Sequence, residues 1–268
     1  MTPHAVRPRL VAFDLDGTLL RSDRTISSRT KSAVAKLVAS DVRVVICTGR
    51  PPRTARAIAE ELGLVDLGIV YNGAAVYNFA SSTALARFDY PSEVALHVLE
   101  RMRHEYPGVT CGLETAQGWF IDTARYEARL RGPRLYEGEP DGVGDVADFI
   151  VGDVTKLLFW HADAPIETMR QSLEGLPVHG TWAIPGLLEV VGWGVTKGRA
   201  LEWVARDLGL KSEEVAAFGD EDNDKEMLDW AGFGVAMANA RESVKEHADW
   251  ITSHCDEDGV AEVIEKWL

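Results

Sequence analysis

The chain has 268 residues, of which 46% are hydrophobic and 26% charged, as in an ordinary globular protein large enough for one or two domains. Its net charge of -14 argues against nonspecific nucleic-acid binding, because most of the surface would repel phosphate groups. No stretch approaches the roughly 18 to 20 continuous apolar residues of a membrane span, and the three cysteines form no C-x-x-C motif. We therefore expect a cytoplasmic protein with neither a nucleic-acid nor a membrane partner.

The first third of the chain alternates strand-like and helix-like segments. Short apolar or β-branched runs predict strands at residues 10–13, 42–47 and 68–71. A helix capped by Ser27 or Ser28 separates the first two strands, and a helix that follows Pro51-Pro52 and ends at Gly63 separates the last two. Strands and helices that alternate across short loops indicate parallel strands joined by right-handed crossovers.

From about residue 80 the pattern changes. The segments predict an inserted α+β domain with a largely antiparallel sheet, and residues 131–148, rich in Gly, Pro and acidic residues, read as a loop. Helices are expected near 93–104 and 166–173, and strands at 109–113, 119–123, 147–151, 156–161, 178–184 and 188–191.

After Gly194 the alternation resumes. Helices are expected at residues 197–208, 224–230 and 260–268, and strands at 215–218 and 234–237. The simplest topology is a doubly wound α/β domain, residues 1–80 and 187–268, interrupted by an α+β domain at residues 81–186.

Oxygen-bearing side chains follow four of the α/β strands. Asp14 and Asp16 come after the first strand, Thr48 after the second, Asn72 after the third and Asp220 after the fourth. Ligands of open parallel sheets bind outside the carboxyl ends of the strands, so these side chains are expected at one edge. Neither acidic stretch is an EF-hand, because the sixth loop position lacks glycine in both. Converging carboxylates instead predict a split Mg²⁺ site.

One cationic side chain is expected beside that site. Lys197 lies between glycines in the sequence G-V-T-K-G, at the start of a predicted helix and at the return into the α/β domain. A lone lysine is more often a solvated surface residue, but this setting favours a phosphate-binding role.

Four motifs occur in order along the chain: D-L-D-G-T-L at 14–19, T-G-R at 48–50, G-V-T-K-G around Lys197 and G-D-E-D-N-D at 219–224. With them the chain resembles the haloacid dehalogenase (HAD) superfamily phosphatases, specifically the Cof-like group with a type IIB cap. The resemblance implies a Rossmann-like core, residues 1–80 and 187–268, and an α+β substrate-specificity cap, residues 81–186.

The resemblance also implies roles for single residues. Asp14 would be the nucleophile that forms an aspartyl-phosphate, and Asp16 the general acid and then the general base. Mg²⁺ would be held by the Asp14 carboxylate, the Asp16 backbone carbonyl and Asp220. The expected phosphate-binding residues are Thr48, Gly49, Lys197 and Asn223, while Asp224 is expected behind the metal site and Arg50 and Asn72 have less certain roles.

The leading hypothesis is a Mg²⁺-dependent phosphatase that acts on small phosphorylated metabolites, with sugar phosphates as the first candidates. Two alternatives stay open. One is a phosphomutase or specialised sugar-phosphate phosphatase of the same family, and the other is a catalytically idle protein that binds a phosphorylated ligand. The expected partner is a small phosphorylated metabolite, and we expect a monomer or a homodimer.

Overall fold

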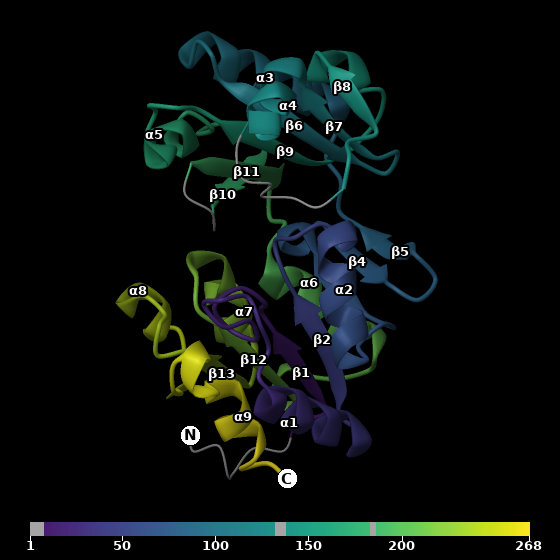
Figure 1. Ribbon diagram of the computed structural model, residues 1–268, viewed down its shortest axis with the longest axis vertical. Helices are drawn as coiled ribbons and strands as arrows, with labels where there is room; N and C mark the ends of the chain where they lie inside the picture. The colour runs from purple at the N-terminus through teal and green to yellow at the C-terminus, as the bar shows by residue number, and fades with distance from the viewer. Residues whose placement is uncertain (1–7, 132–137, 183–185) are drawn as a thin grey trace. The chain divides into compact units, whose positions relative to one another are not determined.

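The structure, a computed structural model, describes residues 8–131, 138–182 and 186–268 (Figure 1). It divides into two compact units, Met1–Ala86 with Thr196–Leu268, and Arg87–Val195. The boundaries between the units, at residues 86/87 and 195/196, differ from the expected ones at 80/81 and 186/187. Strand β5 (Thr83–Arg87) joins the sheet of the first unit, and β11 (Leu187–Gly192) joins the sheet of the second.

The first unit is built on an eight-stranded sheet, counted over the described residues, in the order β14-β13-β12-β1-β2-β3-β4-β5. The pairs from β14 to β3 are parallel, and β3 and β4 are antiparallel. The central strand β1 is fully buried and entirely apolar, as strands covered on both faces are. Besides β5, the strands are β1 (Leu10–Phe13), β2 (Arg43–Cys47), β3 (Gly68–Val70), β4 (Ala75–Asn78), β12 (Val215–Gly219), β13 (Phe233–Ala236) and β14 (Trp250–Ile251).

The helices of the first unit cover both faces of this sheet. The strand order reverses at β1, so right-handed crossovers place α1 and α2 on one face and α7 on the other. Helix α9 contacts α1, and α6 contacts α7, which completes the two layers (Figure 1). The α-helices are α1 (Ser28–Ala39), α2 (Pro52–Leu62), α6 (Lys197–Asp207), α7 (Lys225–Trp230), α8 (Glu242–Lys245) and α9 (Gly259–Ile264). Short 3-10 turns are η2 (Tyr71–Gly73), η4 (Ser212–Glu214), η5 (Asp222–Asp224) and η6 (Cys255–Glu257).

Local sequence explains the ends of the first two helices. The side chain of Ser27 accepts a hydrogen bond from the backbone N–H of Thr30 and so caps α1. Helix α2 ends at Gly63, which has the left-handed conformation (φ 70°) that glycine adopts without strain. The predicted caps at both helices are confirmed.

The second unit has a sheet in the order β10-β11-β9-β6-β7-β8. All its pairs are antiparallel except β7 with β8, which confirms the largely antiparallel prediction. Its apolar core includes residues of α3, α5, β6, β9 and β11. Besides β11, its elements are α3 (Ser92–Glu105), β6 (Thr110–Thr115), β7 (Trp119–Asp122), α4 (Thr123–Arg131), β8 (Gly142–Gly144), η3 (Val146–Phe149), β9 (Val154–Trp160), α5 (Ile166–Gln171) and β10 (Val178–Thr181).

Some predicted elements are wrong. Residues 147–151 do not form a strand, because the carboxylate of Asp145 caps the backbone N–H of Ala147 and starts the 3-10 turn η3. Helix α4 was not predicted, since its sequence T-A-R-Y-E-A-R-L-R offers only a weak apolar stripe. The predicted strand 178–184 ends at Thr181, and residues 183–185 lie outside the described parts. None of the helices in the described parts is long and apolar enough to cross a membrane.

Candidate active site

The nucleophile candidate Asp14 and the acidic residue Asp220 lie side by side because their strands do. Strands β1 and β12 are parallel neighbours with Phe13 opposite Phe218, so a carboxylate follows each strand at the same edge of the sheet. The backbone N–H of Asp14 donates to the carbonyl of Phe218 at 3.0 Å, which extends the pairing to the site itself. Both carboxylates are buried.

The turn that follows Asp14 requires its glycine. Gly17 has a φ of 84°, in the left-handed region, and a Cβ at this position would lie 2.3 Å from Asp220 Oδ2. The next residue, Thr18, donates its hydroxyl to Asp220 Oδ1 at 2.9 Å. The G-T of the D-L-D-G-T-L motif therefore brings the turn against Asp220 and fixes the orientation of that carboxylate.

Lys197 is the buried cation of the site. It is the first residue of α6, and its Nζ donates to Asp14 Oδ1 at 2.6 Å and to Asp224 Oδ1 at 2.7 Å. The start of α6 reaches this position because Gly73 packs directly on it: a Cβ on Gly73 would lie 2.2 Å from the carbonyl oxygen of Thr196. The predicted phosphate-binding lysine is thus placed between two carboxylates.

Asp224 shapes the acidic loop rather than facing open space. It is fully buried, and its Oδ2 accepts the backbone N–H groups of Asp220 and Glu221, each at 3.0 Å. Its Oδ1 accepts from Lys197. These contacts tie the loop after β12 to α6, which suits the expected position of Asp224 behind the site.

Burial changes the acidity of these groups. Loss of hydration raises the pKa of Asp14 well above its usual value, although Lys197 opposes the shift. Burial and the neighbouring Asp224 raise the pKa of Asp220 to about 7. Burial disfavours the charged ammonium of Lys197, but Asp14 and Asp224 outweigh it and raise the pKa of that lysine. The site therefore carries a permanent positive charge beside carboxylates that bind protons readily.

The donor set fits a hard divalent cation. Asp14, Asp220 and Asp224 each offer a carboxylate oxygen, and these three atoms lie within 4.8 Å of one another. Oxygen ligands of this kind suit Mg²⁺, and a cation would remove the cost of burying ionised carboxylates together. The set shares Asp14 and Asp220 with the predicted ligands.

The Asp16 carboxylate lies outside that set, bound by Arg50. Arg50 Nε donates to Asp16 Oδ2 at 2.7 Å and Nη2 donates to Oδ1 at 2.5 Å. This bidentate pairing is the strongest geometry open to an arginine and a carboxylate. The role of Arg50, left uncertain by the sequence, includes this contact with Asp16.

Thr48, Gly49, Asn72 and Asn223 lie together around the ends of β2 and β3. Asn223 Nδ2 donates to Asn72 Oδ1 at 2.9 Å, and a Cβ on Gly49 would lie 2.7 Å from the same Asn72 oxygen. Thr48 Oγ1 accepts the backbone N–H of Arg50 at 3.1 Å, which leaves its own hydroxyl hydrogen for another acceptor. Among the described residues, Asn223 Oδ1 is buried without a hydrogen-bond partner. The described parts of the chain therefore satisfy this amide group incompletely.

Two contacts to Asp220 were missed by the sequence reasoning. Thr18 donates its hydroxyl to Asp220 Oδ1, and the amide Nδ2 of Asn239 lies 3.2 Å from Asp220 Oδ2. Asn239 follows the end of β13, so the rule that polar residues after parallel strands gather at one edge would have found it.

Comparisons with known proteins agree with this geometry. A family model described as haloacid dehalogenase-like hydrolase matches residues 11–264. The 5-amino-6-(5-phospho-D-ribitylamino)uracil phosphatase YitU of Bacillus subtilis is 30% identical over 270 residues, which cover 98% of each chain. The HMP-PP phosphatase of Serratia proteamaculans is 32% identical over 265 residues, which cover 97% of this chain and 95% of that one.

Solved structures are similar over the same length. A haloacid dehalogenase-like hydrolase from Bacteroides thetaiotaomicron has a TM-score of 0.80 at 30% identity and covers 98% of this chain and 100% of its own. The HAD subclass IIB sugar phosphatase BT4131 has a TM-score of 0.83 at 25% identity and covers 96% of this chain and 98% of its own.

Proposed function

The chain belongs to the haloacid dehalogenase-like hydrolases, and from that premise we propose that it hydrolyses phosphate esters of small metabolites through a phosphoryl group carried on Asp14. The observation that carries the proposal is the buried pair of Lys197 and Asp14, 2.6 Å apart, with Asp220 on the neighbouring strand. Because Lys197 fixes the Asp14 carboxylate, the attacking oxygen is already oriented and the site needs little rearrangement before it reacts with phosphorus.

In the first half-reaction an Asp14 carboxylate oxygen attacks phosphorus. A bond forms between that oxygen and phosphorus, the bond from phosphorus to the leaving oxygen breaks, and Asp16 gives its proton to the leaving oxygen. In the second half-reaction water attacks the same phosphorus, Asp16 takes a proton from it, and the Asp14 carboxylate is restored with release of inorganic phosphate.

Both oxygens of Asp16 accept from Arg50, so Asp16 must leave this contact and take up a proton before it acts as the general acid. The two carboxylates of the D-x-D motif have different partners, Lys197 for Asp14 and Arg50 for Asp16. One is held for attack on phosphorus and the other is free of the buried acidic cluster. This division explains why the chain uses two aspartates one residue apart.

The phosphoryl group would be held by neutral donors and one cation. Lys197 supplies positive charge, and Thr48 retains a hydroxyl hydrogen to donate. Asn223 Oδ1 is an acceptor without a partner among the described residues, so a bound water or a hydroxyl of the substrate, and not a phosphoryl oxygen, would complete its hydrogen bonding. Phosphoryl transfer asks mainly for such positioning and charge stabilisation.

We propose Mg²⁺ as the divalent cation. Asp14 and Asp220 would hold it, with the Asp16 backbone carbonyl as the third protein ligand, and Asp224 would fix the loop behind them. When bound, Mg²⁺ would neutralise part of the charge on the phosphate and keep Asp14 ionised.

The substrate is proposed to be a phosphate ester of a small polar metabolite, with sugar phosphates first. The names of three relatives give their substrates as 5-amino-6-(5-phospho-D-ribitylamino)uracil, HMP-PP and, for BT4131, sugar phosphates. We assign substrate selection to the second unit, whose sheet buries polar groups: Glu114 and the ion pair of Lys156 with Glu189. Three buried free cysteines suit the reducing, cytoplasmic setting expected from the sequence.

The experiment is a screen of the purified protein with Mg²⁺ against phosphorylated metabolites, with phosphate release as the readout. Hydrolysis of one compound class, lost in chelator and in Asp14→Asn, supports the proposal, and turnover retained in Asp14→Asn overturns it. Turnover that requires a bisphosphate activator indicates the phosphomutase alternative. Tight phosphate binding without hydrolysis of any compound indicates the idle binding protein.

A further inference from the structure

Asn239 joins three separate segments of the first unit through one side-chain amide. It follows β13, and its Nδ2 donates to the carbonyl oxygen of Gly17 at 2.8 Å and to Asp220 Oδ2 at 3.2 Å. Its Oδ1 accepts the backbone N–H of Cys255 at 3.0 Å. Both hydrogens and the oxygen of the amide are therefore engaged.

The orientation of this amide is set by its partners. A backbone carbonyl such as that of Gly17 can only accept, and a backbone N–H such as that of Cys255 can only donate. The amide nitrogen must therefore face Gly17 and Asp220, and the amide oxygen must face Cys255. The backbone groups of Gly17 and Cys255 therefore fix the orientation in which the Asn239 amide donates to Asp220.

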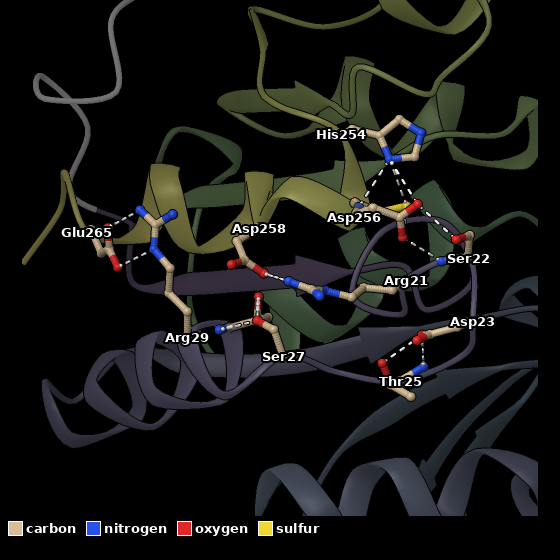
Figure 2. Close-up of polar contacts among 12 residues, drawn as sticks. Arg21, Ser22, Asp23, Thr25, Ser27, Arg29, His254, Asp256, Asp258 and Glu265 are labelled. Carbon is tan, nitrogen blue, oxygen red and sulfur yellow. Dashed lines mark hydrogen bonds and ion pairs between the residues drawn. The ribbon is translucent and has the colours of Figure 1, made fainter.

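The Cys255 end of this link is itself anchored to the segment that follows the nucleophile turn. Asp256 accepts from the backbone N–H and the hydroxyl of Ser22, each at 2.8 Å, and Arg21 Nη2 donates to Asp258 Oδ1 at 2.6 Å. Figure 2 shows these side chains from the 21–29 and 254–265 segments pointing toward one another. Asn239 thus links Gly17 to Cys255, and the next residue, Asp256, binds Ser22. The segment from Gly17 to Ser22 is therefore held at both ends by the part of the chain that contains Asn239, Cys255 and Asp256.

We propose that Asn239 is a positioning residue for the divalent-cation site, an inference that rests on the proposed function. Asp220 receives one donor on each oxygen, Thr18 on Oδ1 and Asn239 on Oδ2. Each carboxylate oxygen has a further lone pair, so the two donors lock the rotation of Asp220 and leave it able to bind a cation. The same amide holds the Gly17 carbonyl, and with it the turn that carries Asp14 and Asp16.

The test measures cation binding directly. Calorimetric titration with MgCl₂ or MnCl₂, without substrate, is run on the parent, on Asn239→Ala and on the control Asn78→Ala. Asn78, the last residue of β4, accepts the backbone N–H of Ser81, and within the described parts it makes no hydrogen bond or ion pair with the site residues. We expect the cation dissociation constant to rise about 10- to 100-fold in Asn239→Ala, as for other outer partners of metal ligands, and to stay within about twofold in Asn78→Ala.

A parallel assay follows hydrolysis of p-nitrophenyl phosphate against Mg²⁺ concentration. Asn239→Ala should need more Mg²⁺ and recover part of its kcat at saturation. A purely structural role would instead lower the melting temperature of the Asn239→Ala variant and leave its cation dissociation constant and Mg²⁺ dependence at the parent values. That result would overturn the inference.

If Asn239→Ala does not fold, Asn239→Asp provides the test. The aspartate has the same shape and keeps the acceptor for Cys255 N–H, but it turns an oxygen toward Gly17 O and Asp220. We expect kcat at saturating Mg²⁺ to fall at least about tenfold, and a folded Asn239→Asp protein with parental kcat and cation affinity contradicts the role. Absence of cation binding by the parent would count against the proposed cation site itself, which separates the two failures.

Discussion

Arg50 donates two hydrogen bonds to the carboxylate of Asp16, from Nε at 2.7 Å and from Nη2 at 2.5 Å. The two carboxylates of the D-x-D motif repel each other when both are charged, and this contact gives one of them a cation of its own. Asp14 is buried against Lys197, and Asp16 is paired with a different cation. The two residues are separated only by Leu15 in the sequence, and they have different partners and different proposed roles.

Removal of the guanidinium at position 50 should impair the step that needs a general acid. In Arg50→Ala the Asp16 carboxylate loses its orientation, and we expect kcat for a sugar phosphate to fall by about tenfold or more. p-Nitrophenyl phosphate has a leaving group that departs without a proton, so its formation of the phosphoryl-enzyme should change much less.

The comparison uses the pre-steady-state rate of phosphoryl-enzyme formation from each substrate, because hydrolysis of the phosphoryl-enzyme needs Asp16 as a base with either one. Arg56→Ala is the matched control. Arg56 binds the Phe79 carbonyl and Ser82 in the same unit, so its removal should leave both rates near parental values. Equal losses on the two substrates in Arg50→Ala would show that Arg50 acts on something other than the leaving group.

Asp16→Asn should separate the two half-reactions. The amide cannot donate the proton or activate water, so we expect sugar-phosphate hydrolysis to fall by about 10²- to 10⁴-fold. With p-nitrophenyl phosphate, the first step needs no acid and the second still needs a base, so phosphoryl-enzyme should accumulate. Rapid-quench measurement of a burst of p-nitrophenol checks this, and an Asp16→Asn variant that turns over both substrates at parental rates would remove Asp16 from the mechanism.

The stabilisation of the fold by a bound cation should increase with pH. The pKa of Asp220 in the metal-free fold is about 7, above its ordinary 3.8, because of burial and Asp224. Between these values the folded protein holds a proton that the unfolded chain has lost, so metal-free stability falls as pH rises through this window. A cation takes the place of that proton, and its stabilisation should be larger at high pH.

Melting temperatures with and without MgCl₂ test this linkage. We expect the Mg²⁺-induced increase to be larger at about pH 8 than at about pH 6, with KCl at matched ionic strength as the control. An increase that is the same at both pH values, or larger at low pH, would mean that the cation does not bind at Asp220.

The sequence patterns located the parts of the site that depend on strand ends. Asp14 and Asp220 lie at the carboxyl ends of β1 and β12, and a run of buried apolar residues before a polar one predicts such a position. The caps at Ser27 and Gly63 were predictable for a similar reason, since each depends on the chemistry of one residue and its immediate neighbours.

Other features depend on contacts that a local pattern does not encode. The pairing of Arg50 with Asp16 joins two loops 34 residues apart, and Asn239 meets Gly17 across 222 residues. Helix α4 has too weak an apolar stripe to be recognised, and β5 has an ordinary sequence that becomes a strand because it lies beside β4.

The central claim is that the phosphoryl group is carried on Asp14, and borohydride trapping tests it most directly. Borohydride reduces an aspartyl-phosphate to homoserine, so enzyme quenched during turnover and digested should carry that change at position 14. We predict homoserine at Asp14 when substrate and Mg²⁺ are present, and none without substrate or in Asp14→Asn. Steady turnover with an unmodified Asp14, or with homoserine formed at another aspartate, would contradict the account.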